Sequence, residues 1–173
     1  MAVDAPSFRR ALGQFASGIT VVTARDARGR AVGLTASSFC SVSLEPPLVL
    51  VCVDHRSDVD VALAEGALFG VSVLAEGQAE WSRRFAAGGT DKFRDGGLVA
   101  GPQGTLLVPG ALAHLECRVT AGHSGGDHTI WVGEVRSLAV APGRPLVYHA
   151  SGYCRLEGNG AAAEAGAGAP DRV

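Results

Sequence analysis

Four short segments of the chain combine hydroxyl, charged and small residues in ways that suit ligand binding. The first covers residues 33–39 (GLTASSF), where three hydroxyl side chains and small residues fall together in an apolar, strand-like run. Small side chains let a flat ligand approach the backbone, and N–H groups and hydroxyls then bind its polar edge. The structural alternative is that the local backbone satisfies these hydroxyls.

The second segment runs from Asp54 to Ser57 (DHRS), between an apolar run at 48–53 and a predicted short helix. Free N–H groups at a helix start attract phosphate, and Ser57 adds a hydroxyl. Asp58 and Asp60 in the first turn would repel an anion. An ordinary helix capped by Ser57 is therefore an equal alternative.

The third segment, Asp91-Lys92-Phe93, holds the only lysine among the chain's 15 lysine and arginine residues. A lysine beside an aromatic ring suits a phosphate with an adjoining ring system, whereas a solvated loop lysine is the common alternative. The fourth segment, residues 126–135 (GDHTIWVGEV), places His128 at a glycine-hinged start of a strand. A surface histidine on a hairpin turn is the alternative there.

Composition excludes several classes of function. The net charge of -2 provides no basic surface for nucleic acid or an anionic membrane. No apolar run reaches the ~18 residues of a membrane span, and the N-terminus lacks a signal core, so we expect a cytoplasmic protein. His123 and His128 fit no standard metal site, and we predict no metal. The four cysteines form no CxxC pair and are expected to be buried, reduced thiols.

Periodicity predicts a mainly β chain with few, short helices. Helices are expected from Pro6, with Phe8, Leu12 and Phe15 on one face, after Ser57, and at 79–86. Strands are expected at 19–24, 31–42, 48–53, 68–74, 112–120 and 129–140, with short extended segments at 145–148 and 153–156. We expect these strands to pair antiparallel and to close into a barrel, because closure leaves no exposed strand edge.

Two details of this pattern make specific predictions. In 112–120, Leu115, Cys117 and Val119 are expected inward, and Glu116, Arg118 and Thr120 outward. In 129–140 the alternation breaks at Gly133-Glu134, which predicts a bulge. The folded unit is expected to span 1–157, followed by a disordered Gly/Ala-rich tail at 158–173.

Taken together, these segments resemble the flavin reductase-like family, the FMN-binding split barrels, and within it the reductase components of two-component flavin-dependent monooxygenases. The resemblance rests on the order and spacing of FASGITVVTA (15–24), GLTASSFCSVSLEPPLVLVCVD (33–54), FGVSVL (69–74), DKF (91–93), GDHTIWVGEV (126–135) and LVYHASGYCRL (146–156). It implies a six-stranded antiparallel Greek-key split barrel that forms a homodimer and binds flavin near the subunit interface.

The resemblance also implies roles for individual residues. The isoalloxazine ring would lie along Thr35, Ala36, Ser37 and Ser38, and the ribityl phosphate would face Cys52, Val53, Asp54 and Ser57. Phe85, Lys92 and Phe93 would close over phosphate or adenylate, His128 would contact the nicotinamide nucleotide, and Tyr153 would border the same pocket. His55-Arg56 departs from simpler loops of the family and bears on whether the adenine half of FAD is held.

The implied reaction is hydride transfer from C4 of NADH to N5 of FAD or FMN, after which reduced flavin leaves for a partner monooxygenase. Such a transfer works by positioning and needs no catalytic side chain, with His128 assisting. No arginine adjoins His128 to read a 2′-phosphate, which favours NADH over NADPH. The alternatives are a flavin-binding split-barrel oxidase and a non-catalytic flavin- or haem-binding protein.

Overall fold

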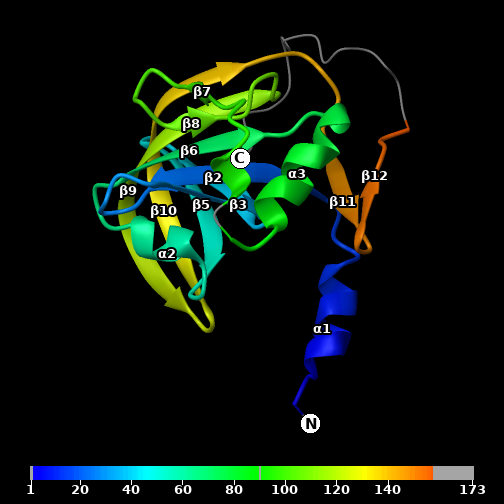
Figure 1. The fold of residues 1–173 in the computed structure, drawn as a ribbon. Helices are drawn as coiled ribbons and strands as arrows, with labels where there is room; N and C mark the ends of the chain where they lie inside the picture. The colour runs from blue at the N-terminus through cyan, green and yellow to red at the C-terminus, as the bar shows by residue number, and fades with distance from the viewer. Residues whose placement is uncertain (1, 90, 158–173) are drawn as a thin grey trace.

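A mainly antiparallel β structure carries short helices on its outside (Figure 1). The computed structural model describes residues 2–89 and 91–157, so the tail predicted at 158–173 lies outside the described residues. The helices are α1 (Ala5–Leu12), α2 (Asp58–Ala62) and α3 (Ala79–Ala86), with 3-10 turns η1 (Glu76–Gln78) and η2 (Asp91–Phe93). The strands are β1 (Ser17–Gly18), β2 (Thr20–Arg25), β3 (Ala31–Ala36), β4 (Phe39–Leu44), β5 (Pro47–Asp54), β6 (Leu68–Val73), β7 (Val99–Ala100), β8 (Leu106–Leu107), β9 (Ala113–Gly125), β10 (His128–Val140), β11 (Val147–His149) and β12 (Gly152–Cys154).

The main sheet closes into a barrel through a kinked strand. Its seven strands run in the order β3-β2-β6-β9-β10-β5-β4, so β3 and β4 stand at opposite ends of the series. These two strands are consecutive in the chain, and only Ser37 and Ser38 separate them. Counting them as one strand, as predicted for 31–42, leaves the predicted six. The Cys52 N–H donates to the Ser38 carbonyl at 3.2 Å, which extends the pairing of β4 with β5 into the bend.

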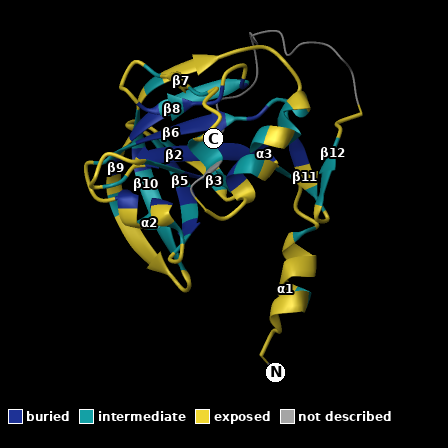
Figure 2. Ribbon diagram, in the orientation of Figure 1, coloured by how far each residue is buried: buried dark blue, intermediate teal, exposed yellow. Residues whose placement is uncertain are grey.

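Two apolar clusters explain why the β2 segment is apolar without alternation. Val22 and Ala24 face the barrel interior, where they pack with Val51 and Phe69. Val21 faces the other way, into a second cluster beneath α3. A strand covered on both faces has no solvent side to carry polar residues, and Figure 2 shows β2 buried along its length.

Helix α3 spans the predicted residues 79–86, and α2 begins after Ser57 as predicted but ends at Ala62, before the predicted end at Gly66. The Ser57 hydroxyl accepts from the Val59 N–H at 3.2 Å and caps α2. Helix α3 buries Phe85 against β3, where a Cβ on Gly33 would lie 2.7 Å from Phe85 Cε1. The missing side chain at Gly33 therefore accommodates α3, and not the approach of a ligand.

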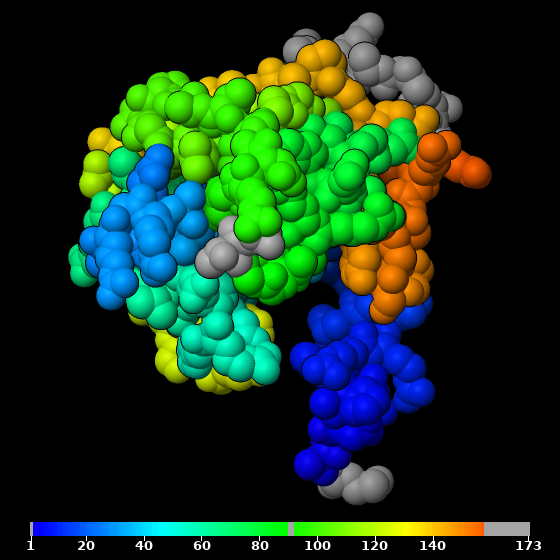
Figure 3. All heavy atoms as spheres, viewed as in Figure 1, coloured from blue at the N-terminus to red at the C-terminus, as the bar shows by residue number. Residues whose placement is uncertain are grey.

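Helix α1 extends away from the barrel, as the ribbon and the space-filling view both show (Figures 1 and 3). Asp4 caps it by accepting from the Ser7 N–H at 2.9 Å. None of its residues is buried, and Phe8 and Leu12 remain 57% and 53% exposed. Phe15, predicted on the same face, lies beyond the end of the helix.

Some predictions for the sheet are confirmed and others are wrong. The predicted bulge is confirmed, because the β9–β10 register shifts between Val132 and Gly133. Glu116 is buried, although we expected it to face solvent. The Gln103 N–H and the Thr105 N–H and hydroxyl donate to its carboxylate, so the loop that holds these two residues covers this face of β9.

The cysteines also differ from expectation. Cys117 alone among them is buried; Cys40 is exposed, and Cys52 and Cys154 are half-buried. Burial, followed by the nearby charge of Glu116, raises the pKa of the Cys117 thiol to about 12. Within residues 2–89 and 91–157, no helix combines the length and apolar character that crossing a membrane requires.

Candidate functional site

A groove of about 450 Å³ opens where β3 bends into β4 and faces the end of β5. It brings together segments that the sequence separates by up to ninety-four positions, from Leu34 to His128. Eleven of the thirteen predicted site residues line it: Thr35, Ala36, Ser37, Ser38, Cys52, Val53, Asp54, Ser57, Phe85, Lys92 and His128. The sheet register sets part of this arrangement, because His128 on β10 lies directly opposite Asp54 on β5.

The groove hydroxyls differ in what they offer a ligand. The Thr35 hydroxyl donates to the Ser82 carbonyl at 2.6 Å, and the Ser38 hydroxyl donates to the Cys52 carbonyl at 2.9 Å. A hydroxyl has one proton, so both can only accept from a ligand. The Ser57 hydroxyl accepts from a backbone N–H and keeps its proton to donate. The polar edge of the groove thus has acceptors at one end and a donor at the other.

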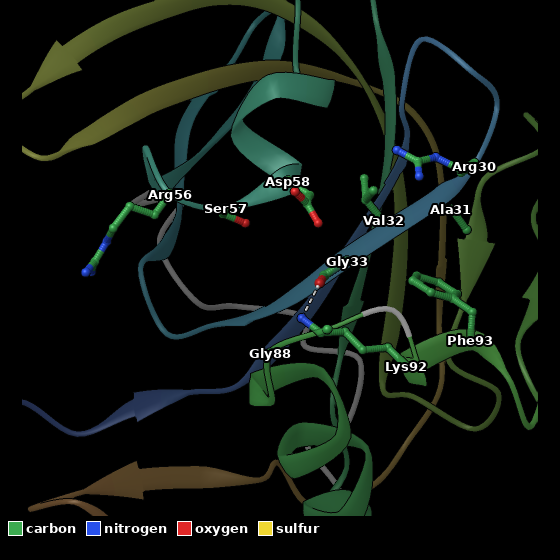
Figure 4. A pocket seen from close by; sticks show the side chains of 11 residues that line it. Arg30, Ala31, Val32, Gly33, Arg56, Ser57, Asp58, Gly88, Lys92 and Phe93 are labelled. Carbon is green, nitrogen blue, oxygen red and sulfur yellow. Dashed lines mark hydrogen bonds between the residues drawn. The ribbon is translucent and has the colours of Figure 1, made fainter.

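Lys92 places a fixed cation at the donor end of the groove. Its Nζ donates to the Gly33 carbonyl at 2.9 Å and to the Phe85 carbonyl at 3.1 Å, and Figure 4 draws the first of these bonds. An ammonium has three donors, so one remains for a ligand. Burial lowers the pKa of Lys92, and the Asp58 carboxylate opposes that shift in part.

His128 and the Asp54 carboxylate lie at the opposite wall, each held by a neighbour. His128 Nδ1 lies 2.7 Å from Asp127 Oδ1 and donates there, so Nε2 is an acceptor whenever the ring carries one proton. Arg56 donates to both oxygens of Asp54, at 3.0 and 2.6 Å. These hydrogen bonds hold the pKa of Asp54 well below its ordinary value, so the carboxylate is charged at neutral pH.

Two predicted site residues lie outside the groove. Phe93 packs edge-on against Phe85, with ring centroids 5.3 Å apart, and lines an adjoining hollow. Tyr153 is not among the lining residues, and its hydroxyl donates to the Ser82 hydroxyl at 2.9 Å. Tyr153 thus does not line the groove itself, Ser82 connects it to Thr35, and its role at the border of the pocket stays a prediction.

Sequence reasoning missed Ser82, which is buried and bonds to both Thr35 and Tyr153. Its position three residues before Phe85 puts it on the buried face of α3, and this spacing was the available signal. It also missed Arg30 and Asp58 as members of the hollow beside the groove. Arg30 follows a hairpin turn, and its local sequence gives no sign of what lies opposite.

Comparison with known proteins adds independent information. A family model described as "Flavin reductase like domain" matches residues 12–157. An NADH-dependent flavin reductase from a Rhodococcus species is 41% identical over 151 residues, which cover 86% of this chain and 85% of that protein. The reductase subunit HsaB of a flavin-dependent monooxygenase from Rhodococcus jostii is 39% identical over 157 residues, covering 90% and 80%.

Solved structures agree with the sequence comparison. The NADH:FAD oxidoreductase SgcE6 of Streptomyces globisporus, in complex with NAD and FAD fragments, superposes with a TM-score of 0.83 at 38% identity. That match covers 92% of this chain and 99% of the other. The split-barrel fold class expected from the sequence is confirmed. With a family model matching most of its length and relatives at about 40% identity, the chain belongs to the flavin reductase-like family.

Proposed function

We propose that this protein is an NADH-dependent flavin reductase that delivers reduced FAD or FMN to a monooxygenase. The observation that carries the proposal is the groove, which joins a ledge of small residues and hydroxyls to a fixed cation at one end and His128 at the other. In the balanced reaction, NADH, a proton and oxidised flavin give NAD⁺ and reduced flavin. The relatives' names, which include NADH-dependent flavin reductases and monooxygenase reductase subunits, support it.

The flavin ring fits the ledge at residues 35–38, with Cys52 and Val53 as the facing wall. Thr35 and Ser38 offer acceptors to the single N–H of the oxidised ring, because their own protons are engaged by the backbone. The ribityl phosphate fits the other end, where the Ser57 hydroxyl and the remaining Lys92 donor point to an anion. Asp54, already paired with Arg56, stands beside His128 at the opposite wall.

His128 fits the role of nicotinamide contact. Its Nε2 accepts, and a carboxamide NH₂ is a donor of matching chemistry. Flavin supplies the hydride acceptor when bound, and the chain's part is to hold two rings in contact and exclude alternative poses. This division of work requires no side chain to act as nucleophile or proton donor.

The groove is open and carries a single lysine, so reduced flavin can leave it. This suits a flavin that serves as substrate and passes to a separate oxygenase. The cytoplasmic location expected from the sequence stays a prediction.

Helix α1 supports the proposed homodimer. An isolated eight-residue helix is marginal in water, and its stability comes from burying an apolar face. Phe8 and Leu12 find no cover within the described part of this chain. A second copy that covers them would give the helix its missing support. Sedimentation equilibrium should report a dimer for the unaltered protein and a monomer for Phe8→Glu with Leu12→Glu.

The reductase function is tested by following NADH oxidation anaerobically with and without added flavin. A reductase oxidises NADH only when FAD or FMN is supplied, in a one-to-one ratio with flavin reduced. A storage protein binds flavin with no turnover. An oxidase of the same fold would turn over only with a further organic substrate and oxygen. Flavin binding without turnover, or turnover that depends on such a substrate and oxygen, would contradict the proposal.

A further inference from the structure

A hollow of about 490 Å³ opens on the outer face of β2, β6 and β9, beside the loop that leads into β8. Cys117 and Val119 belong to the barrel interior, so Arg118 between them points outward and lines this hollow. The hollow shares no lining residue with the flavin groove or with the space that adjoins it. The reductase function therefore gives it no role.

Two arginines stand on either side of one leucine in this space, which we call the arginine hollow. Ala24 on β2 pairs with Phe69 on β6, so the next residues, Arg25 and Leu68, are neighbours. Leu68 in turn lies opposite Arg118 on β9. Opposite residues of antiparallel strands share a face, and two strand spacings place the two arginine backbones about 10 Å apart. Both side chains line the hollow and can reach a ligand held between them.

Neither guanidinium has a carboxylate partner within residues 2–89 and 91–157. Arg25 Nη1 donates to the Gly29 carbonyl and Arg118 Nη1 donates to the Gly66 carbonyl, each at 2.9 Å. A guanidinium has further N–H donors, so both arginines keep donors for a ligand. None of the described residues that line the hollow is acidic, and two positive charges face it without compensation.

The loop beside the hollow is held in place before any ligand arrives. The buried Glu116 carboxylate accepts from the Gln103 N–H and from the Thr105 N–H and hydroxyl, at 2.8–3.2 Å. The Gly101 N–H donates to the Thr105 carbonyl at 2.8 Å and closes the loop. The charge of Glu116 is thus directed to the loop. A wall that is already ordered lowers the entropy cost of binding.

The surface between the arginines is apolar. Ala67, Leu68 and Leu106 line the hollow and are only half-buried, so part of each side chain remains accessible to a ligand. The Thr23 hydroxyl donates to the Leu106 carbonyl and holds β8 against β2. An inorganic anion would satisfy the arginines but leave this apolar surface uncovered. The combination suits a ligand with one anionic group and an apolar body.

We propose that the arginine hollow binds a small apolar carboxylate. Arg25 and Arg118 hold the carboxylate, because planar guanidinium donors match its two oxygens. Leu68 and Leu106 contact the apolar body of the ligand. This site is separate from the groove for flavin and NADH, and the proposal does not depend on the reductase function.

The test uses three probes that differ in charge and in apolar surface. Benzoate has both features, benzyl alcohol lacks the charge, and acetate lacks the apolar body. Each is titrated into isotope-labelled protein, with and without FMN, and heteronuclear NMR identifies the amides that shift. We expect benzoate to shift the amides of Leu68, Thr105 and Arg118 equally in both series, and the other two probes to bind at least 10-fold more weakly. These amides report the site directly, so the result stands even if the protein fails to bind FMN or to oxidise NADH.

Arg25→Gln and Arg118→Gln remove the charges one at a time and keep a polar side chain. Each should raise the Kd for benzoate roughly 10-fold, and the double variant should show no shift at these amides. Arg28→Gln is the matched control, because Arg28 is exposed on the turn between β2 and β3 and does not line the hollow. Its Kd should equal that of the unaltered protein, and the amide spectrum of each variant shows whether it is folded.

Four outcomes would overturn the proposal. Benzoate could fail to shift amides around the hollow, or shift only those of the groove that contains Lys92. Benzyl alcohol or acetate could bind as tightly as benzoate, which would remove the role of the charge or of the apolar body. A folded Arg118→Gln protein could retain the Kd of Arg28→Gln, which would exclude Arg118 as the carboxylate partner.

Discussion

The Thr35 hydroxyl lies 2.6 Å from the Ser82 carbonyl, so the strand that forms the ledge of the groove is bonded to the helix beside it. The Ser82 side chain makes a second contact, because its hydroxyl accepts from the Tyr153 hydroxyl at 2.9 Å. Through Ser82 the C-terminal strand β12, helix α3 and strand β3 form one connected unit. The hydroxyl of Thr35 is thereby held as an acceptor facing the groove.

Ser82→Ala should lower the free energy of unfolding by about 1–3 kcal/mol, because the Tyr153 hydroxyl loses its acceptor. Thr35 keeps its hydrogen bond, because that bond goes to the backbone carbonyl of residue 82. The KM for flavin should therefore stay close to that of the unaltered protein. Tyr153→Phe is the partner variant. In urea unfolding, the double variant should cost about as much as Ser82→Ala alone; fully additive costs would show that the two hydroxyls do not interact.

Gly33→Ala should destabilise the protein by about 1–3 kcal/mol, through crowding in a packed region. The added Cβ would lie 2.7 Å from Phe85 Cε1 and 3.0 Å from the Val22 carbonyl oxygen, and the backbone atom cannot turn away. Gly18→Ala is the control, because nothing lies within 4 Å of its new Cβ. Thermal unfolding should show a smaller cost of Gly33→Ala in a Phe85→Leu background. An equal cost in both backgrounds would place the clash elsewhere.

The fold was largely predictable because its signals are local. Strand 19–24 is β-branched, Ser57 is a standard helix cap, and the broken alternation at Gly133 marked the bulge. The break at Ser37–Ser38 was not predicted, since small and hydroxyl residues continue a strand pattern without interruption. The burial of Glu116 depends on a loop at 101–105 that lies beside it only in the folded chain.

The site was predictable through its motifs and less so through its geometry. The motifs located eleven lining residues, but not which hydroxyl protons are already engaged. The hydroxyls of Thr35 and Ser38 can only accept from a ligand, because the backbone carbonyls of Ser82 and Cys52 take their protons. Phe93 contacts Phe85 and faces the adjoining hollow instead of the groove.

Lys92 should make flavin binding sensitive to alkaline pH. Only the ammonium form binds phosphate, and burial lowers the pKa of Lys92 from its ordinary value of 10.5. As pH rises toward that lowered pKa, the ammonium loses its proton. The value of kcat/KM for FMN should therefore start to decrease at a pH lower than 10.5. Riboflavin has no phosphate, and its profile should lack this inflection. Lys92→Met should remove the inflection for FMN as well; its persistence would assign it to another group.

His128 should affect NADH more than flavin. Its Nε2 accepts while Nδ1 is engaged by Asp127, so His128→Ala removes an acceptor suited to the nicotinamide carboxamide. We expect roughly a 10-fold higher KM for NADH, equivalent to about 1.4 kcal/mol, with flavin affinity changed much less. His123→Ala is the control, since His123 on β9 is exposed and does not line the groove. Steady-state kinetics give the KM values and fluorescence titration the flavin affinity. Because the flavin ring is expected at the ledge of residues 35–38, equal losses of both affinities would mean that His128 supports the shape of the groove and makes no separate contact with NADH.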